Sequence, residues 1–138
     1  MSARADFLRE ECDNVEKTLV LIEELLGPRT LGKHEAAALG TYLHNTYSGV
    51  ERLLRSLLDN REIRVASTPT WHKDLLQRAH REDLLSSDQF DGFLRLLAFR
   101  HVYVHGYSHM LDEERLREIA VPTPALVRAF LQGVRGKA

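Results

Sequence analysis

The chain has 138 residues, 43% of them hydrophobic and 28% charged, which excludes a disordered chain and predicts one globular domain over residues 1–138. Nineteen basic and twenty acidic residues give a net charge of −1, which argues against a bulk polyanion binder, so any nucleic-acid contact must be local. The sequence shows no membrane-length apolar run and no secretory leader, and its single cysteine, Cys12, cannot form an internal disulfide. We therefore expect a cytoplasmic protein that makes no use of a membrane.

Apolar residues at helical spacing predict two long helices in the first half of the chain. The first runs from Leu8 to Leu26, includes Cys12 among its core positions and ends at Gly27-Pro28. The second begins near His34 and continues to Asp59-Asn60, about seven turns at 3.6 residues each. Because the connection between them is short, we expect an antiparallel pair.

Capping residues predict shorter helices in the second half. Thr70 can cap a short third helix, and Ser86 opens a capping-box pattern ahead of a Phe/Leu-rich fourth helix. Asp112 can cap a last helical stretch that is interrupted at Pro122 and resumes to about Val134. No alternating strand pattern or hairpin turn competes with these helices. The sequence therefore predicts an all-α fold, an up-and-down bundle of about five helices.

The fourth predicted helix runs into the sequence Arg100 to Tyr107, which has the pattern R-x4-H-x-Y. It brings together a permanent cation, Arg100, a titratable imidazole, His105, and a phenol, Tyr107, a set suited to phosphate binding or phosphodiester chemistry. If the helix continues through the motif, Arg100 and Tyr107 lie two turns apart on one face, and Tyr103 points to the opposite side.

Two structural readings compete with a catalytic one. The run can be the polar end of a helix, with His105 complementing the helix dipole. His101 and His105 also have the i,i+4 spacing of a metal-ligand pair, but no cysteine cluster or HExxH motif joins them, and we expect no metal. A glycine-rich phosphate loop, a GxSxG elbow and a CxxC pair are absent as well, which excludes the common nucleotide-hydrolase, serine-hydrolase and redox motifs.

The motif on a fourth helix resembles the HEPN superfamily, and most closely its HepT-type ribonuclease toxins. Residues Leu43–Arg52 are similar to the second helix of HepT-like domains, and His101 occupies the polar position that follows the motif arginine. The resemblance implies a HEPN-like bundle in which Arg100 and His105 are the catalytic pair of a metal-independent endoribonuclease. It implies that the product is a 2′,3′-cyclic phosphate and that His101 and Tyr107 support RNA binding.

The resemblance also implies partners and a control mechanism, and no cofactor. Toxins of this type form homodimers with the active site at the dimer interface, and tRNA is one candidate among RNA substrates. A cognate nucleotidyltransferase antitoxin modifies the motif tyrosine, here Tyr107, with AMP. An alternative stays open: a non-catalytic HEPN module that binds nucleotide or docks against a nucleotidyltransferase.

Several residues outside the motif have competing interpretations. Arg52 and Arg55 can contact RNA or Glu51, although solvated ion pairing is the commoner role on a helix. Trp71 can stack on a base, but packing in the core is the favoured interpretation. We expect His72 and His80 at the surface.

Overall fold

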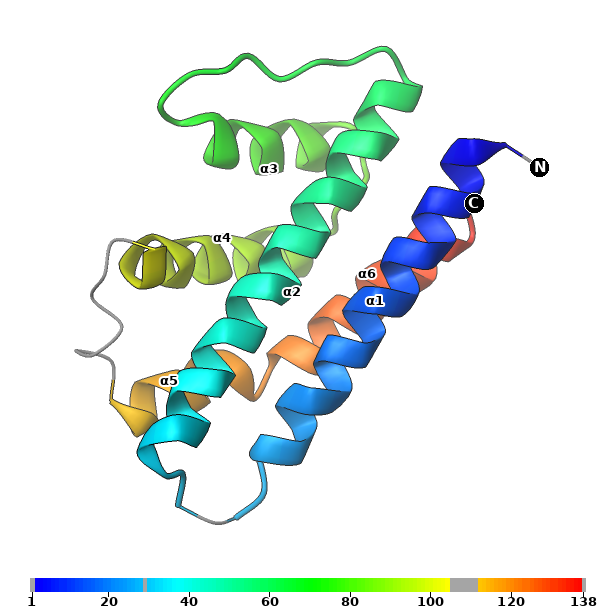
Figure 1. Cartoon of the computed structure of the whole chain (residues 1–138). Helices are drawn as coiled ribbons and strands as arrows, with labels where there is room; N and C mark the ends of the chain where they lie inside the picture. The colour runs from blue at the N-terminus through cyan, green and yellow to red at the C-terminus, as the bar shows by residue number, and fades with distance from the viewer. Residues whose placement is uncertain (1, 29, 105–111, 138) are drawn as a thin grey trace.

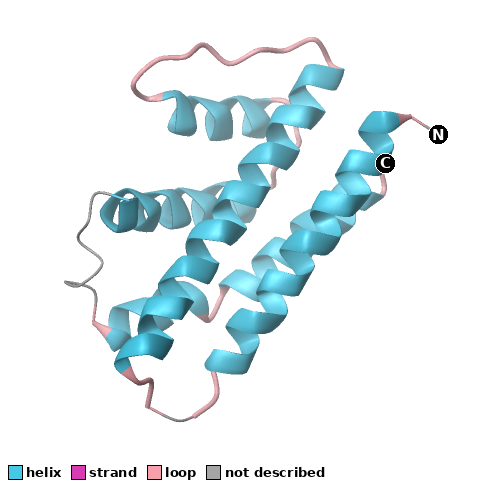
Figure 2. Cartoon of the chain, in the orientation of Figure 1, coloured by secondary structure: helices cyan, strands magenta, loops and turns pink. Residues whose placement is uncertain are grey.

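A computed structural model describes residues 2–28, 30–104 and 112–137. These residues form helices and loops, and no strand occurs among them (Figure 2). The helices, labelled in Figure 1, are α1 Ala3–Leu25, α2 Lys33–Asn60, α3 Trp71–Arg81, α4 Ser87–Val102, α5 Glu113–Ala120 and α6 Thr123–Arg135. The predicted all-α bundle is confirmed.

The first two helices form the predicted antiparallel pair (Figure 1). The α1 stripe predicted from the sequence is buried, and Cys12 is fully inside the core. Burial raises the pKa of the Cys12 thiol, which keeps it protonated. Helix α1 begins earlier than predicted because the Ser2 hydroxyl accepts a hydrogen bond from the Ala5 amide at 3.0 Å.

Helices α3 and α4 pack on each other and cross α2 (Figure 1). The capping box predicted at α4 is present: Ser86 Oγ accepts from the Gln89 amide, and Gln89 Oε1 accepts from the Ser86 amide. Thr70 occupies the predicted N-cap position of α3, but its backbone (φ −106°, ψ 21°) is not the extended one of a capping residue, and its side chain makes no cap bond and donates to Asp74 Oδ2 instead. The α4 cap fixes where the motif-bearing helix starts.

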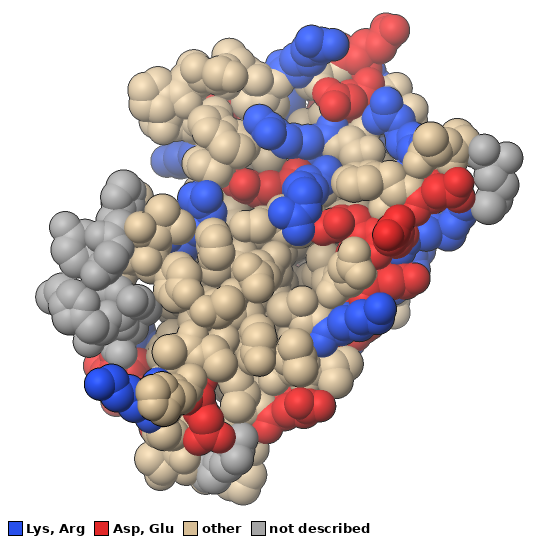
Figure 3. Space-filling model, in the orientation of Figure 1, with Lys and Arg blue, Asp and Glu red and all other residues tan. Residues whose placement is uncertain are grey.

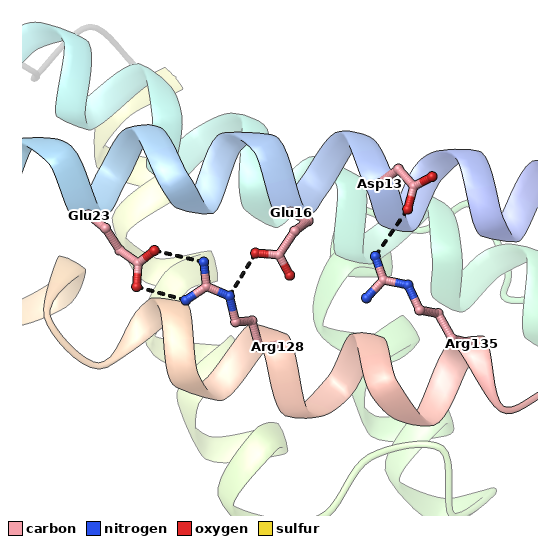
Figure 4. Close-up of polar contacts among 5 residues, drawn as sticks. All are labelled: Asp13, Glu16, Glu23, Arg128 and Arg135. Atoms are coloured by element: carbon pink, nitrogen blue, oxygen red, sulfur yellow. Dashed lines mark hydrogen bonds and ion pairs between the residues drawn. The ribbon is translucent and has the colours of Figure 1, made fainter.

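The last predicted helical stretch consists of two helices, so the described residues contain six rather than about five. Asp112 Oδ1 accepts from the Arg115 amide at 2.8 Å and caps α5 as predicted. The chain turns at Val121-Pro122, where proline cannot donate to the preceding helix. Helix α6 then packs along α1, and Arg128 and Arg135 of α6 form ion pairs with acidic residues of α1 (Figure 4).

Apolar residues of all six helices form a single hydrophobic core. Within the described ranges, no helix combines the length and apolar character that crossing a membrane requires. The last turn of α4 packs against the first half of α2, and this junction carries the polar residues considered next.

Candidate functional site

Arg100 lies in the last turn of α4, where a cation is favoured by the helix dipole. Its side chain is half-buried, and its Nε is shielded from solvent without a hydrogen-bond partner among the described residues. A buried guanidinium donor without a partner is uncommon because leaving it unpaired costs free energy. Arg100 is thus a cation held partly out of water with donor capacity to spare.

Tyr103 anchors the end of α4 to α2. Its hydroxyl lies 2.7 Å from Thr41 Oγ1, and its ring stacks on His44 with the ring centroids 5.4 Å apart. The ring fits closely at Gly40, where an added Cβ would lie 3.1 Å from a ring carbon. After Val102 the backbone widens into a π-helical turn at Tyr103 and Val104, a feature often found at functional sites.

The prediction that Tyr103 points away from the Arg100 side was wrong. Residues three apart on a helix are neighbours on one face, so Arg100 and Tyr103 both approach α2. His44 lies at this face, because its ring stacks on Tyr103 and its pKa responds to the Arg100 charge.

His44 is a half-buried imidazole of α2 that stays neutral near neutral pH. Burial lowers its pKa first, and the positive charge of Arg100 lowers it further. Its Nδ1 is shielded from solvent and has no hydrogen-bond partner among the described residues. The junction therefore pairs a permanent cation with an uncharged imidazole, which can accept or, once protonated, donate a proton.

Polar residues continue along the same side of α2 as a row formed by His44, Tyr47 and Glu51, spaced i, i+3 and i+7. Tyr47 is fully buried, and burial together with the negative charge of Glu51 raises the pKa of its phenol. Glu51 is 6% exposed, and its Oε2 lies 2.6 Å from Nδ1 of His72 on α3. His72 is therefore half-buried in an ion-pairing position, and the prediction of a surface residue was wrong.

The structure describes two of the four predicted site residues of the motif. Arg100 and His101 belong to α4, where His101 is exposed at the helix end. His105 and Tyr107 lie outside the described residues, so their positions remain predictions. Sequence reasoning missed His44 and Glu51 as members of the site: their spacing of seven residues is visible in the sequence, but the burial of this side of α2 is not.

Comparison with models of known protein families identifies the family of this chain. The family model described as HepT-like protein matches residues 38–135, which span α2 to α6 and include both the polar row and the motif arginine. The chain belongs to the HepT-like family. This family is part of the HEPN superfamily, so the resemblance inferred from the sequence is confirmed at that level.

The fold of this HepT-like protein also occurs in a solved structure, the cytosolic protein of unknown function YutE from Bacillus subtilis. The two chains are 18% identical, and the match covers 91% of this chain and 88% of YutE with a TM-score of 0.69. At this identity the likeness shows the fold alone. A comparison with curated proteins finds no match.

Outside the junction, the HepT-like protein uses its other singled-out residues in packing and ion pairs. Arg52 pairs with Glu11 of α1 at 2.8 Å, so its partner is an acid on another helix rather than Glu51. Trp71 is half-buried against the core, as favoured, and the Arg55 guanidinium lies 4.3 Å from the centre of its ring. His80 stacks on Phe90 and is half-buried, which corrects the prediction of a surface position.

The described residues contain no group of three or more His, Cys, Asp or Glu side chains arranged to hold a metal ion. The His101/His105 pair, whose spacing was weighed against a metal site in the sequence and set aside, includes a residue outside the described part.

Proposed function

We propose that this HepT-like protein is the toxin of a toxin–antitoxin system and cleaves RNA as a metal-independent endoribonuclease. The observation that carries the proposal is the state of Arg100: a half-buried cation with an unpartnered Nε, beside a neutral imidazole, at the start of the R-x4-H-x-Y pattern. A guanidinium with unused donors in a partly dry site is suited to binding a phosphodiester.

In the proposed reaction, His105 accepts the proton of a ribose 2′-hydroxyl, and the 2′-oxygen attacks the adjacent phosphorus. Arg100 stabilises the negative charge that develops on the phosphorane oxygens. The products are a 2′,3′-cyclic phosphate and a free 5′-hydroxyl. His101, exposed beside Arg100, supports binding of the RNA backbone.

We propose that a cognate nucleotidyltransferase antitoxin silences the toxin by adding AMP to Tyr107. The added phosphate is an anion placed within the motif, where it would pair with Arg100 and repel RNA. The HepT-like family membership supports this pairing. RNA and this antitoxin are then competing partners for one surface.

We further propose a homodimer with the active site at its interface, acting in the cytoplasm on RNA. A groove of about 830 Å³ between α4, α5 and α6 supports this, because apolar side chains such as Leu96, Phe99 and Val102 line it next to the motif. The molar mass in solution, measured by light scattering, tests the dimer.

The test of the proposed function is RNA cleavage by purified protein in the presence of a chelator. Wild-type protein should cleave, and Arg100→Ala and His105→Ala should each lose about 10²-fold or more in rate. Arg81→Ala is the matched control, because Arg81 is an exposed arginine at the end of α3 and does not line the groove. Equal cleavage by the His105→Ala protein would remove His105 from the mechanism.

A second arm of the experiment tests control by the antitoxin. Incubation with the neighbouring nucleotidyltransferase and ATP should add one AMP to wild-type protein and stop cleavage, and Tyr107→Phe protein should be neither labelled nor silenced. Nucleotide or antitoxin binding by a wild-type protein that never cleaves RNA would instead support the alternative, a non-catalytic docking module.

A further inference from the structure

The second half of α2 and the start of α1 border a basic surface that the proposed function does not use. Two open hollows of about 490 and about 360 Å³ adjoin there, because Arg55 and Asp59 line both of them. We call this the arginine surface, after its four cations Arg4, Arg52, Arg55 and Arg64. Among the described residues that line the hollows, Asp59 is the one acid. In a chain with slightly more acidic than basic residues, this local excess of positive charge favours an anionic partner.

Two of the four arginines have guanidinium donors available for such a partner. Arg52 is already engaged, because its Nε and Nη2 donate to Glu11 Oε1. Arg55 and Arg64 are exposed, and neither forms a hydrogen bond or ion pair with a described residue. Arg55 instead lies against the ring of Trp71. The planar fork of an arginine matches the oxygens of a phosphate, so these two side chains are suited to binding a phosphodiester backbone.

Aromatic rings accompany the cations. Phe7 of α1 lines the larger hollow and is 39% exposed, although a phenyl ring is ordinarily buried. Trp71 is half-buried beside Arg55, whose guanidinium lies 4.3 Å from the centre of the indole ring. Unpaired bases stack on aromatic rings and on arginine planes, whereas a duplex keeps its bases inside. Phosphate-binding cations next to faces that accept bases favour a single-stranded nucleic acid over other anions.

One side of α2 connects the arginine surface with the end of the motif helix. It carries, at the i, i+4, i+7 and i+11 spacing of one helix face, the exposed or half-buried residues Thr41, Asn45, Ser48 and Arg52. Thr41 contacts the hydroxyl of Tyr103 at the end of α4. Arg52 follows about 16 Å further along α2, at 1.5 Å per residue. A strand bound at the arginine surface therefore has a polar path without a carboxylate to the motif helix.

We infer that the arginine surface binds single-stranded RNA and holds the part of a substrate that extends beyond the cleavage site. The choice of RNA rests on the proposed function, whereas the binding itself does not require cleavage. Arg55 and Arg64 contact phosphates, and Phe7 stacks on a base. No bond forms or breaks at this surface, so it contributes affinity rather than chemistry.

The experiment measures binding by fluorescence anisotropy, with labelled 2′-O-methyl oligonucleotides of about 16 nucleotides. These keep the bases and phosphates of RNA but lack the 2′-hydroxyl that cleavage uses. Arg55→Gln and Arg64→Gln should each weaken binding about fivefold and reduce the slope of log K against log salt by about 0.7, the value for one phosphate contact. Arg81→Gln is the matched control and should bind like wild type, because Arg81 is exposed on α3 and lines neither hollow.

A second variant tests the stacking contact separately from charge. Phe7→Ala should weaken binding about fivefold or more with an unchanged salt slope, and should leave the binding of an RNA duplex as it is. Leu21→Ala is its control and should bind like wild type: Leu21 is also 39% exposed on α1 but lines neither hollow. Trp71 is the single tryptophan of the chain, so saturating unlabelled RNA should change the emission of wild-type protein. An unchanged emission would place the RNA elsewhere.

The outcomes separate this inference from the proposed function. Wild-type affinity in both Arg55→Gln and Arg64→Gln, or an equal loss in Arg81→Gln, overturns the inference and leaves the proposed function intact. Poly-glutamate that binds as tightly as RNA and is weakened by the same variants would assign the surface to an acidic protein partner instead. A wild-type protein that binds RNA through these arginines but cleaves none overturns the proposed function alone.

Discussion

His44 shows how one residue can link stability to the site. Both burial and the Arg100 charge oppose its protonated form in the folded protein, so its pKa lies below the ordinary value. The unfolded chain has neither effect and binds a proton at higher pH than the folded chain does. Stability therefore rises with pH across the interval between the two pKa values, and it falls as the solution is acidified through that interval.

We predict that acidification from about pH 7.5 to about pH 5.5 destabilises wild-type protein more than His44→Phe protein. The difference should stay below the full ~1.4 kcal/mol per pH unit that one proton gives, because the ring is partly solvated. Urea unfolding at the two pH values measures it.

The control for this effect is His34→Phe, at an exposed imidazole for which the fold provides no comparable burial. It should lose as much stability on acidification as wild type does. If the His44→Phe protein follows the same pH dependence as wild type, neither burial nor the Arg100 charge lowers the pKa of the imidazole, and our description of the junction fails.

The sequence identifies the motif residues of α4 more readily than the residues of α2 that pack near them. Arg100 was found because its spacing to His105 and Tyr107 is visible in the sequence. His44 and Glu51 were missed because a histidine and an acid within a long helix are ordinarily solvated, and only the packing of α3 and α4 shows that this side of α2 is buried. Polar residues become a site through tertiary contacts that a linear pattern does not contain.

At the scale of the elements, local chemistry predicts helix ends well and helix faces less well. Ser86 and Asp112 cap α4 and α5 as predicted, because an N-cap needs only atoms within three residues along the chain. The error over Tyr103 arose from assigning its side without reference to α2, which its hydroxyl contacts at Thr41. The contact that holds the end of α4 is non-local.

The close packing of α1 against α2 at Gly49 leads to a second prediction, about the stability of a Gly49→Ala variant. A Cβ added there would lie 2.5 Å from Val15 Cγ2, so alanine must displace a buried β-branched side chain. The intrinsic gain in helix propensity, about 1 kcal/mol, opposes an overpacking cost of about 1–3 kcal/mol. We expect Gly49→Ala to lower the free energy of unfolding by about 1 kcal/mol in urea denaturation.

Gly133 of α6 is the matched control, because a Cβ added there meets no described atom within 4 Å. Gly133→Ala should raise the free energy of unfolding by about 0.5 kcal/mol through helix propensity alone. Stabilisation by both substitutions would show that α1 and α2 are less tightly packed at Gly49 than the structure indicates.

At the scale of the whole molecule, charge is distributed without a dominant sign. On the face shown in Figure 3, basic and acidic side chains are intermixed around an uncharged central area. This agrees with the net charge of −1, and it means that the proposed binding of RNA would depend on a local group such as Arg100 rather than on a general positive field. Other charged residues form ion pairs between helices.

Arg128 is the clearest case, because it joins the first helix to the last (Figure 4). Its Nη1 and Nη2 donate to both carboxylate oxygens of Glu23 at 2.7 Å, and its Nε donates to Glu16 Oε2 at 2.7 Å. The hydrogen bonds and the charge of Arg128 lower the pKa of Glu23, so this contribution is present above the ordinary carboxyl range and is lost as the pH falls through the lowered value.

We predict that Arg128→Met lowers the free energy of unfolding by about 1 kcal/mol, because it removes a fork-shaped contact to two acids that links the ends of the chain. Arg135→Met is the control: it removes one exposed pair, to Asp13 at 3.1 Å, and should cost less than about 0.5 kcal/mol. In about 1 M salt the Debye length is about 3 Å, so ion pairs are screened. Urea denaturation under these conditions should give a smaller difference in the free energy of unfolding between the two variants. Equal losses at low salt would mean that the two-acid arrangement around Arg128 adds nothing beyond an ordinary surface pair.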